Sequence, residues 1–546
     1  MREKLGRAAH SPILWFSALA VLQGTLFGRS ELAHWTIPAL AVFALLPLCC
    51  VFTGKTPRER LAGLAPCAAV WALMLLSLRF GFTSLAVLAA LGAVLLFFAA
   101  RLWRRGEMNW ERAALFLLAA AVVLRLAYVL VTPHTLRQHD LYGHRNYITW
   151  IVENDLRIPV LSIDPRSHSQ FYHPPLHHLL SAIWVKLQML FGADLEQGLE
   201  SVQALALLWS NLALLFSYRL FKELNLRGSG LFAACAVSGF LPVLIFGAAG
   251  INNDALLYML EMALILSAVR WWRRPTAGRC ALMGLLLGLC METKLSGALL
   301  AVPLGVLFLA ALIQRRAPAK ALWGQYALFL LLSVPAGFAY SIYSLLRWGM
   351  PLNYVERFPE TFEQYLSGYS ALERMFGVSK AQLRNIYLNF WEPEIQDSNM
   401  FLALLKSISF DDFTIISQGS RLRALQFLPL CLYLFVIAMA LYALWRGART
   451  VAGYVRRRSI PTTSGFLLLI AAVLMASYIQ FCFAYPFVCT QHARYVLPIF
   501  PIAAACVGKG KAGRTRTVIT VGLVLFSALM FALLIGQTEW RLLTAA

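Results

Sequence analysis

Long apolar runs recur along most of this chain and constrain its fold more than any other feature. A helix crosses the hydrocarbon core of a bilayer with about 20 consecutive apolar residues, and about fifteen runs come close to that length. They lie at 12–28, 35–53, 62–78, 82–100, 113–132, 201–218, 231–250, 254–271, 280–293, 296–313, 324–345, 425–445, 464–484, 495–508 and 517–536. The sequence therefore predicts an all-α, polytopic membrane protein.

The composition supports this class and excludes the nucleic-acid-binding class that a net charge of +22 first suggests. The chain is 60% hydrophobic and 14% charged, whereas soluble domains are roughly half apolar and a quarter charged. Its basic residues fall in short clusters between apolar runs, as in the cytoplasmic loops that orient membrane spans. We therefore expect membrane lipids as partners and no nucleic acid.

One apolar run, LHHLLSAIWVKLQMLFG at 176–192, decides the topology. If it lies on the outer surface as an amphipathic helix, nineteen lysines and arginines after residue 200 fall in inner loops. The short outer loops then hold only Lys294 and Arg494. Because positive charge favours the cytoplasmic side, we predict this arrangement, with two large outer segments at 133–200 and 346–424 that carry surface helices.

The first outer segment begins with the polar stretch HTLRQHDLYGHRNYITW at 134–150. In a helix, Asp140 and His144 are four residues apart and share a face. A carboxylate beside an imidazole can deprotonate a hydroxyl, since each tunes the pKa of the other. We therefore predict Asp140 as a catalytic base tuned by His139 or His144, with Arg137 nearby. The alternative is a solvated cluster that holds a surface helix at the headgroup level.

The next stretch, SQFYHPPLHHLL, places Tyr172 and His173 before two prolines that give the following helix a sharp start. We expect Tyr172, His173, His177 and His178 at the membrane surface, where a tyrosine is a common anchor. Asp140 with His144 and His173 offers ligand types that divalent metals accept. Their spacing matches no known ligand motif, so no metal site is predicted and a divalent metal stays an open alternative.

These residues resemble the polyprenyl-phosphate-sugar-dependent glycosyltransferases of the GT-C superfamily. The nearest likeness is to the protein O-mannosyltransferase and lipid A aminoarabinose transferase branch, glycosyltransferase family 39. An acidic residue outside an early span precedes YHPPL, and three further stretches follow in the family's order: GINNDALLYMLEMAL, GLLLGLCMETKLSG and HARYVLPIFPIAA. The resemblance implies an inverting sugar transfer on the outer face, with Asp140 as base and a lipid, glycan or protein as acceptor. The family commonly has a second acidic residue where this chain has His139.

The resemblance also implies a division of the chain into four parts. Residues 1–112 look like an added amino-terminal transmembrane module, and 113–345 form a GT-C-like catalytic core that includes the outer loop at 133–200. Residues 346–424 form the second outer segment, and 425–546 the carboxyl-terminal transmembrane helices. The class implies a bacterial plasma membrane, with the endoplasmic reticulum as the alternative.

Cations are expected at the outer membrane level, because the leaving group of such a donor is a lipid phosphate whose charge must be compensated. Arginine suits this task through its bidentate fork, so Arg494 is the first candidate. Lys294 is the second, and a salt bridge with the nearby Glu292 is its alternative role. Asp254, in another outer turn, is expected to shape the acceptor pocket.

Further expectations concern the second outer segment and the spans. Loops as long as 346–424 are usually functional, so Trp391 and Glu392 are predicted to contact a sugar, the alternative being a structural cap. Arg125 and Glu261 lie inside spans, where charge is costly. We expect them to pair with each other, or Arg125 to extend towards the phosphate level.

Two other functions stay open. A transporter or flippase of a lipid-linked saccharide would spread polar residues through the middle of the spans, whereas this chain concentrates them in two outer segments. A polyprenyl-diphosphate-dependent ligase or polymerase would use a histidine base, so that His173 would matter more than Asp140. A disulfide between Cys482 and Cys489 is a weaker expectation.

Overall fold

The computed structural model describes residues 84–546, apart from 131, 191, 367, 393–394, 417–424, 459–460, 511 and 546. The predicted spans at 12–28, 35–53 and 62–78 lie outside these residues. Within the described part, regular structure is entirely helical, with one isolated β-bridge between Tyr365 and Phe487. The all-α prediction is therefore confirmed.

The α-helices follow one another along most of the chain. They are α5 (Ser84–Arg104), α6 (Trp110–Leu130), α7 (Leu141–Glu153), α8 (Leu176–Leu190), α9 (Leu195–Glu223), α10 (Gly228–Phe240), α11 (Pro242–Phe246), α12 (Asp254–Arg273), α13 (Ala277–Thr293), α14 (Ala301–Ile313), α15 (Ala319–Trp348), α16 (Ala371–Phe376), α17 (Lys380–Arg384), α18 (Met400–Phe410), α19 (Phe427–Arg457), α20 (Thr462–Ala484), α21 (Ile499–Gly508) and α22 (Arg514–Ala545). Short 3₁₀ helices are η1 (Pro159–Leu161), η2 (Pro165–Ser167), η3 (Gly247–Ala249), η4 (Leu295–Leu300), η6 (Val488–Thr490) and η7 (Ala493–Val496).

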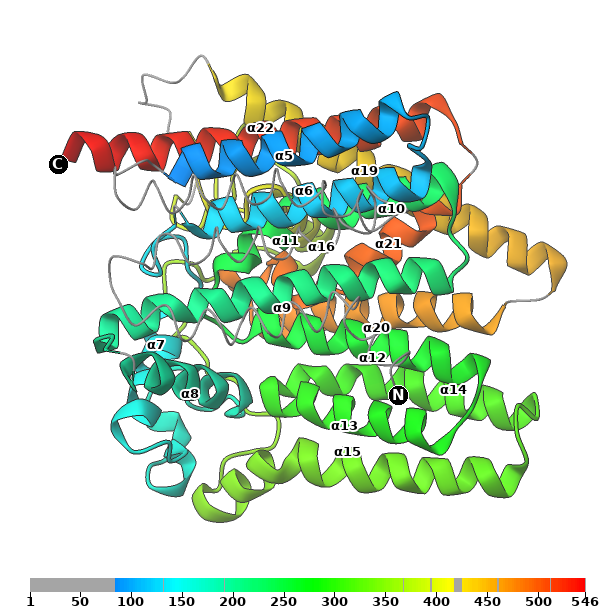
Figure 1. Ribbon diagram of the computed structural model, residues 1–546. Coiled ribbons are helices and arrows are strands. Elements are labelled where there is room, and N and C mark those ends of the chain that lie inside the picture. The colour runs from blue at the N-terminus through cyan, green and yellow to red at the C-terminus, as the bar shows by residue number, and fades with distance from the viewer. Residues whose placement is uncertain are drawn as a thin grey trace.

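The long helices run side by side as one bundle (Figure 1). Among the described residues, eight helices are long and apolar enough to cross a membrane. A ninth span is formed if α10 and the α11–η3 segment count together, with a bend of 60° between them. The bend lies where Leu241 precedes Pro242, because proline pushes the residue before it out of helical geometry. The chain is therefore a multi-pass membrane protein, and the count of fifteen spans stays a prediction.

Two further predicted spans coincide with shorter helices. The run at 280–293 forms α13, which has 17 residues, and the run at 495–508 forms α21, which has 10. Both pack inside the bundle, α13 against α15 and α21 against α10. Neighbouring helices therefore cover these two segments.

The basic loops gather at one end of the bundle, as the predicted topology requires. The loops that follow α9, α12, α14, α19 and α21 all lie at the end remote from α7 and α8 (Figure 1). Acidic residues there are few. Glu223 accepts from Arg270 at 2.9 Å and from Arg273 at 2.7 Å.

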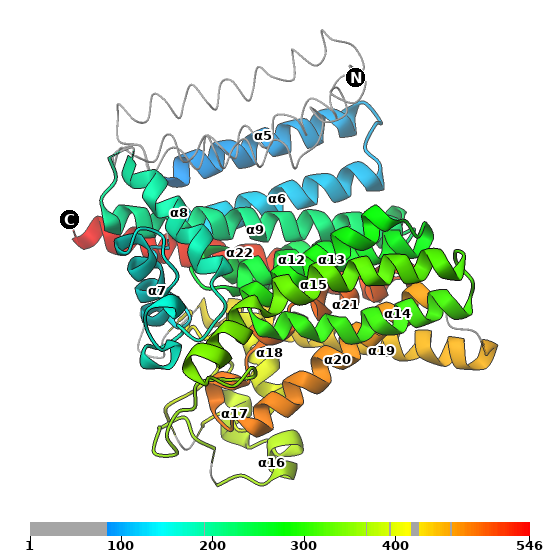
Figure 2. The same ribbon diagram turned by 90° about the horizontal axis from the view of Figure 1, so that it is seen from below.

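Helices α7 and α8 pack against each other at the opposite end, which we call the site end (Figures 1 and 2). With 15 residues, α8 is too short to be among the candidate spans, in agreement with the predicted surface helix. His177 and His178, which are expected at the membrane surface, do not face outward from this helix. Both are fully buried, because this face of α8 packs into the protein.

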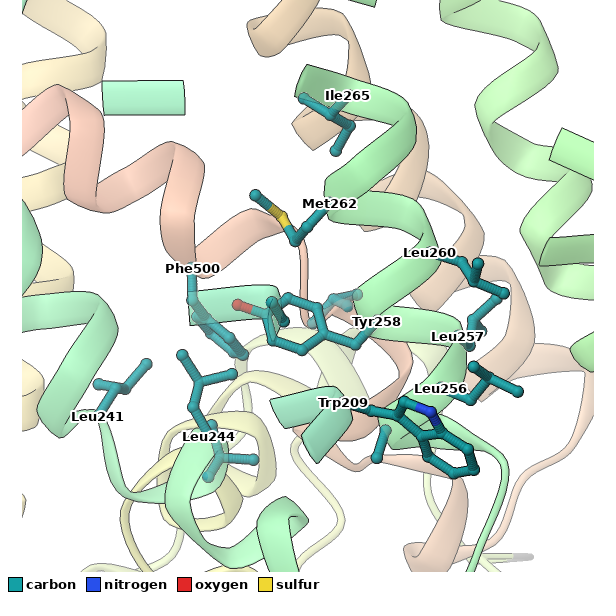
Figure 3. Close-up of a cluster of buried hydrophobic side chains, with 14 of the residues drawn as sticks. Trp209, Leu241, Leu244, Leu256, Leu257, Tyr258, Leu260, Met262, Ile265 and Phe500 are labelled. Carbon is teal, nitrogen blue, oxygen red and sulfur yellow. The ribbon is translucent and has the colours of Figure 1, made fainter. Parts of the chain in front are cut away.

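The core beside the site end is formed by α9, α11, α12 and α21 (Figure 3). Trp209, Leu244, Tyr258 and Phe500 meet there, each less than a tenth exposed. Helix α12 is the most enclosed candidate span, with 78% of its apolar window buried, against 28% for α19. Its first residue, Asp254, therefore lies near the middle of the site end.

Within the described residues of 346–424, a buried ion pair fixes the loop before α18. Lys406 and Asp397 form this fully buried pair, with oxygen distances of 2.7 and 2.9 Å from Lys406 Nζ. Asp397 also accepts the backbone N–H of Asn389 at 3.0 Å. Removal of one partner from such a pair costs about 3–5 kcal/mol, so the pair holds Asp397 firmly against α18.

Candidate active site

Four charged side chains from four separate segments form a row at the site end. Arg494 donates to Asp140 Oδ2 at 2.9 Å, and the same nitrogen lies 3.9 Å from Asp254 Oδ2. Lys294 Nζ donates to Asp254 Oδ1 at 2.7 Å. We call Asp140, Arg494, Asp254 and Lys294 the charged row. Anions and cations alternate along it, so each carboxylate has a cationic neighbour.

Local backbone geometry orients the two carboxylates of the charged row. Asp140 directly precedes α7 in the left-handed region, at φ 51°, and its side chain makes no cap hydrogen bond. It is therefore free to reach Arg494. Asp254 begins α12, where the positive end of the helix dipole stabilises a carboxylate. Its backbone N–H donates to Asn252 Oδ1 at 3.1 Å, which confirms the expected turn.

Electrostatics keep Asp140 ionised. Its partial burial opposes ionisation, but the Arg494 guanidinium outweighs this and holds the pKa of Asp140 below its usual value. The Asp140 side chain is still 37% exposed, against 13% for Arg494. The carboxylate is thus deprotonated at neutral pH and reachable from solvent, and it is a weak base for as long as Arg494 binds it.

A pocket opens beside the row, and the empty space in it, open solvent included, is about 340 Å³. Its charged lining is Arg494, Lys294, Asp254 and Glu261. Its apolar lining includes four leucines: Leu257, Leu299, Leu474 and Leu497. The Arg494 Nε atom is buried and has no hydrogen-bond partner in the structure. The cavity therefore combines two cations and two carboxylates with apolar side chains.

Two sequence-based pairings at charged residues are wrong. Lys294 bonds to Asp254, whereas Glu292 accepts the backbone N–H of Tyr340 at 3.2 Å. Arg125 does not pair with Glu261 or extend outward. Its guanidinium donates within the bundle to Gly239 O at 2.8 Å, Ala121 O at 3.1 Å and Ser210 Oγ at 3.2 Å. Glu261 lines the cavity instead.

The predicted partner of Asp140, His144, faces the protein interior. Its Nδ1 lies 2.9 Å from His178 Nε2, and its ring stacks on His173 with centroids 6.1 Å apart. Burial lowers the pKa of His144 to about 3, although Asp140 raises it in part, and burial also holds the pKa of His173 well below 6.5. Both imidazoles are neutral at pH 7. The three side chains considered as metal ligands are therefore engaged separately, with Asp140 on Arg494.

Four other residues are predicted from the sequence to belong to the site. Tyr172 lies against His173, with ring centroids 4.3 Å apart, and Arg137 has a buried Nη1 without a hydrogen-bond partner. Trp391 is 55% exposed and Glu392 is also exposed, and neither lines the cavity. The structure does not bring these two residues to the charged row.

A second ionic group, missed by the sequence reasoning, lies next to the row. His139, Asp411, Asp412 and His492 offer ligand-type atoms that all lie within 4.8 Å of one another. We call these four residues the His–Asp cluster. Among the described residues, this is the group whose geometry could hold a metal ion. The two consecutive aspartates after α18 were the available signal in the sequence.

Cys482 and Cys489 are both free thiols, so the expected disulfide is absent between them. Cys482 is buried and its Sγ lies 3.6 Å from the Thr490 carbonyl oxygen. Burial raises the pKa of the Cys489 thiol to about 12.

Comparison with known families gives one match within the chain. Residues 172–339 match the family model described as dolichyl-phosphate-mannose-protein mannosyltransferase. Over these residues the chain is similar to that family of glycosyltransferases. The matched part, under a third of the 546 residues, begins at Tyr172 and contains Asp254 and Lys294, while Asp140 and Arg494 lie outside it.

The comparison with solved structures gives a weaker likeness. The apo oligosaccharyltransferase from Archaeoglobus fulgidus aligns at 12% identity and a TM-score of 0.41, over 78% of this chain and 56% of that enzyme. That similarity is too low to bear on the reaction. No curated protein matches the chain.

Proposed function

We propose that this chain is a GT-C glycosyltransferase that transfers a sugar from a polyprenyl-phosphate donor to an acceptor hydroxyl, and that Asp140 is its catalytic base. Asp140 Oδ2 takes the hydroxyl proton while the hydroxyl oxygen bonds to the anomeric carbon. The bond from that carbon to the phosphate oxygen breaks, and lipid phosphate leaves. The observation that carries the proposal is the position of Arg494, which bonds Asp140 and also lines the cavity with Lys294.

The cavity suits a lipid phosphate. Its two cations, Arg494 and Lys294, can both donate to a phosphate, since fixed donors aimed at a leaving group stabilise the transition state. The Arg494 Nε atom, buried and unpartnered, offers one further donor. The leucines of the lining are compatible with the first isoprene units, because such sites are mostly apolar with a few placed polar groups.

Donor binding would also switch on the base. A phosphate that binds Arg494 competes with Asp140 for the same guanidinium. Loss of that partner raises the pKa of Asp140 towards its usual value, which makes the carboxylate a better proton acceptor. The base thus gains strength only after the donor has arrived.

The arrangement supports inversion and an outer-face site. Asp140 does not line the cavity, and Arg494 lies between them. A base and a leaving group on opposite sides of the anomeric carbon give in-line displacement. The site end also lies away from the basic loops (Figure 1), which the charge bias assigns to the cytoplasmic side. We propose the plasma membrane of a bacterium as its location.

The test uses the full chain in nanodiscs with a panel of radiolabelled polyprenyl-phosphate sugars and candidate acceptor hydroxyls. Release of lipid phosphate is compared for the native chain, Asp140→Asn and Arg494→Ala. Asp164→Asn is the matched control, because Asp164 also pairs with an arginine, Arg166 at 2.6 Å, away from the cavity. We expect donor-specific turnover that Asp140→Asn abolishes and Asp164→Asn retains.

Three results would contradict the proposal. Normal turnover in Asp140→Asn would exclude it as the base. Turnover only with a diphosphate donor, lost in His173→Gln, would indicate the ligase alternative. Binding and transmembrane movement of the donor without its cleavage would indicate a flippase.

A further inference from the structure

The contacts of His139 in the His–Asp cluster are explained by hydrogen atoms. His139 lies between the two carboxylates: its Nε2 is 2.5 Å from Asp411 Oδ1, and its Nδ1 is 2.7 Å from Asp412 Oδ2. A neutral imidazole has one N–H, whereas an imidazolium has two. A ring with a carboxylate at each nitrogen is therefore best matched by the doubly protonated form.

The position of the ring hydrogen of His492 follows from its contact with a backbone N–H. Its Nδ1 accepts the N–H of Arg494 at 3.0 Å and caps η7. A nitrogen that accepts carries no hydrogen, so the ring hydrogen lies on Nε2. That atom is 2.8 Å from Asp411 Oδ1 and 3.1 Å from Asp412 Oδ1. The two distances are those of an ionic contact, and His492 Nε2 makes no hydrogen bond to either carboxylate.

The cluster connects the segments that carry the reactive pair. His139 directly precedes Asp140, and His492 caps the backbone N–H of Arg494 itself. The two aspartates follow the end of α18, which is fixed to the same turn because Ala493 N–H donates to Ser407 Oγ at 3.0 Å. Two members of the cluster are buried, Asp411 at 4% and His492 at 2% exposed, whereas the side chain of Asp412 is 26% exposed.

We propose that the His–Asp cluster is a proton-balanced ionic lock that positions Asp140 against Arg494. Its four members are positioning residues that act through the backbone of their neighbours. This role rests on the proposed function. A displacement of about 1 Å in a catalytic group can cost on the order of 10²-fold in rate, so loss of the lock is expected in turnover more than in donor affinity.

A divalent cation is the competing occupant. Histidine and carboxylate ligands suit zinc and related metals, and His139 could bind one through Nε2 while its Nδ1–H donates to Asp412. His492 does not fit as a ligand, because Nε2 can bind a metal only without its hydrogen. That would require a hydrogen on Nδ1, where the Arg494 N–H already points. The observed contacts therefore favour the proton-balanced lock.

The kinetic test compares Asp411→Asn and Asp412→Asn with the native chain in the transfer assay. We expect kcat to fall about 10²-fold, with the donor KM within about threefold. Asp412→Glu, which keeps the charge, should recover part of the loss. Asp164→Asn again removes a carboxylate from an arginine pair at the site end and should leave both constants unchanged. Unchanged kcat in both asparagine variants would overturn the lock.

Two measurements test the lock without any turnover, and so separate it from the proposed function. In ¹⁵N-histidine NMR at pH 8, the native chain should show one imidazolium with both ring nitrogens protonated, and His139→Gln should lack it. Metal analysis of the native chain, purified without chelator and then exposed to Zn²⁺ and Mn²⁺, should give no stoichiometric ion. One ion per chain, lost in Asp411→Asn, would overturn the proposal in favour of a metal site, as would absence of the imidazolium.

Discussion

His139 and Asp140 are neighbours in the chain but belong to ionic groups with different properties. Asp140 ends the charged row, whose other three members line a cavity, and its own side chain is 37% exposed. His139 belongs to the His–Asp cluster, whose members do not line that cavity. The row can therefore exchange partners with a ligand, whereas both ring nitrogens of His139 are engaged by carboxylates of the protein. Reactivity and rigidity are thus separated between two consecutive residues.

The balance of charges in the charged row explains why this group can respond to a bound donor. It contains two carboxylates and two cations, so a phosphodiester that binds there adds one negative charge to a balanced set. That addition raises the pKa of the nearest carboxylate. Asp254 stays paired to Lys294 at 2.7 Å, so Asp140 at the exposed end is the group that takes up the change.

The largest effect is expected from Asp140→Asn, which removes the proton acceptor and keeps the shape. General-base catalysis contributes about 10²–10⁴-fold, so kcat should fall by roughly 10³-fold. Donor affinity should stay equal or increase, because Arg494 no longer has an ionic competitor. Single-turnover kinetics and donor-binding isotherms on the same preparation measure both. Weaker donor binding would mean that Asp140 contacts the sugar directly.

Arg494→Ala is expected to rank second, with a loss of about 10²–10³-fold in kcat, as for removal of other fixed charge-stabilising donors. Arg494→Lys should recover little, because a lysine lacks the Nε and the bidentate fork. A double variant of Asp140 and Arg494 tests whether the two residues act together. If the two act on one proton and one phosphate, the double loss will be far smaller than the product of the single losses. Independent losses would show that they do not act together.

Much of the fold could be predicted from the sequence because span length and loop charge are local properties. The surface helix at 176–190 is an example: its assignment needed only the charges of later loops. Asp140 and Arg494 were each selected from residue type and neighbourhood. Their contact, between positions 354 residues apart, could not be, since it depends on how the segment before α7 and the η7 turn meet.

The errors have a physical origin in helix ends and close backbone contacts. Glu292 belongs to the last turn of α13, whereas Lys294 is extended at φ −160°, so these near neighbours point apart. Arg125 needs no carboxylate because Gly239, without a side chain, lets its carbonyl approach the guanidinium. The His–Asp cluster was missed since Asp411 lies 272 residues from His139.

Lys294→Met should have a smaller effect, about tenfold and mainly in the donor KM, because Arg494 remains to bind the phosphate. This variant leaves Asp254 buried without its closest partner, which itself destabilises the protein. The matched control is Lys294→Met with Asp254→Asn, which removes both charges. If the double variant regains stability but not donor affinity, Lys294 binds phosphate. Recovery of both would reduce its role to the ion pair.

The smallest expected effect is on the stability of the folded protein, and it tests the His–Asp cluster. Burial opposes protonation of His139, but Asp411 and Asp412 outweigh burial and the opposing Arg494, so the pKa of His139 is raised well above 6.5. Its stabilisation is therefore complete below about pH 6.5 and is lost as the pH rises through the raised value. The pKa values of Asp411 and Asp412 are lowered by His139 and His492 against burial. Their contribution is present above about pH 4 and is lost in stronger acid.

We therefore expect the Tm of the native chain to exceed that of His139→Gln by the largest margin, on the order of a few degrees, between about pH 5 and 6.5. The margin should narrow at alkaline pH, since His139 loses its charge while both carboxylates keep theirs. His168→Gln is the matched control, because His168 is exposed and remote from these aspartates. Thermal unfolding in one detergent across this pH range measures the margin. A difference in Tm that widens as the pH rises would mean that His139 is neutral in the folded protein. The His–Asp cluster would then not be held by the charge of His139, and the contrast between a fixed cluster and a responsive row would be wrong.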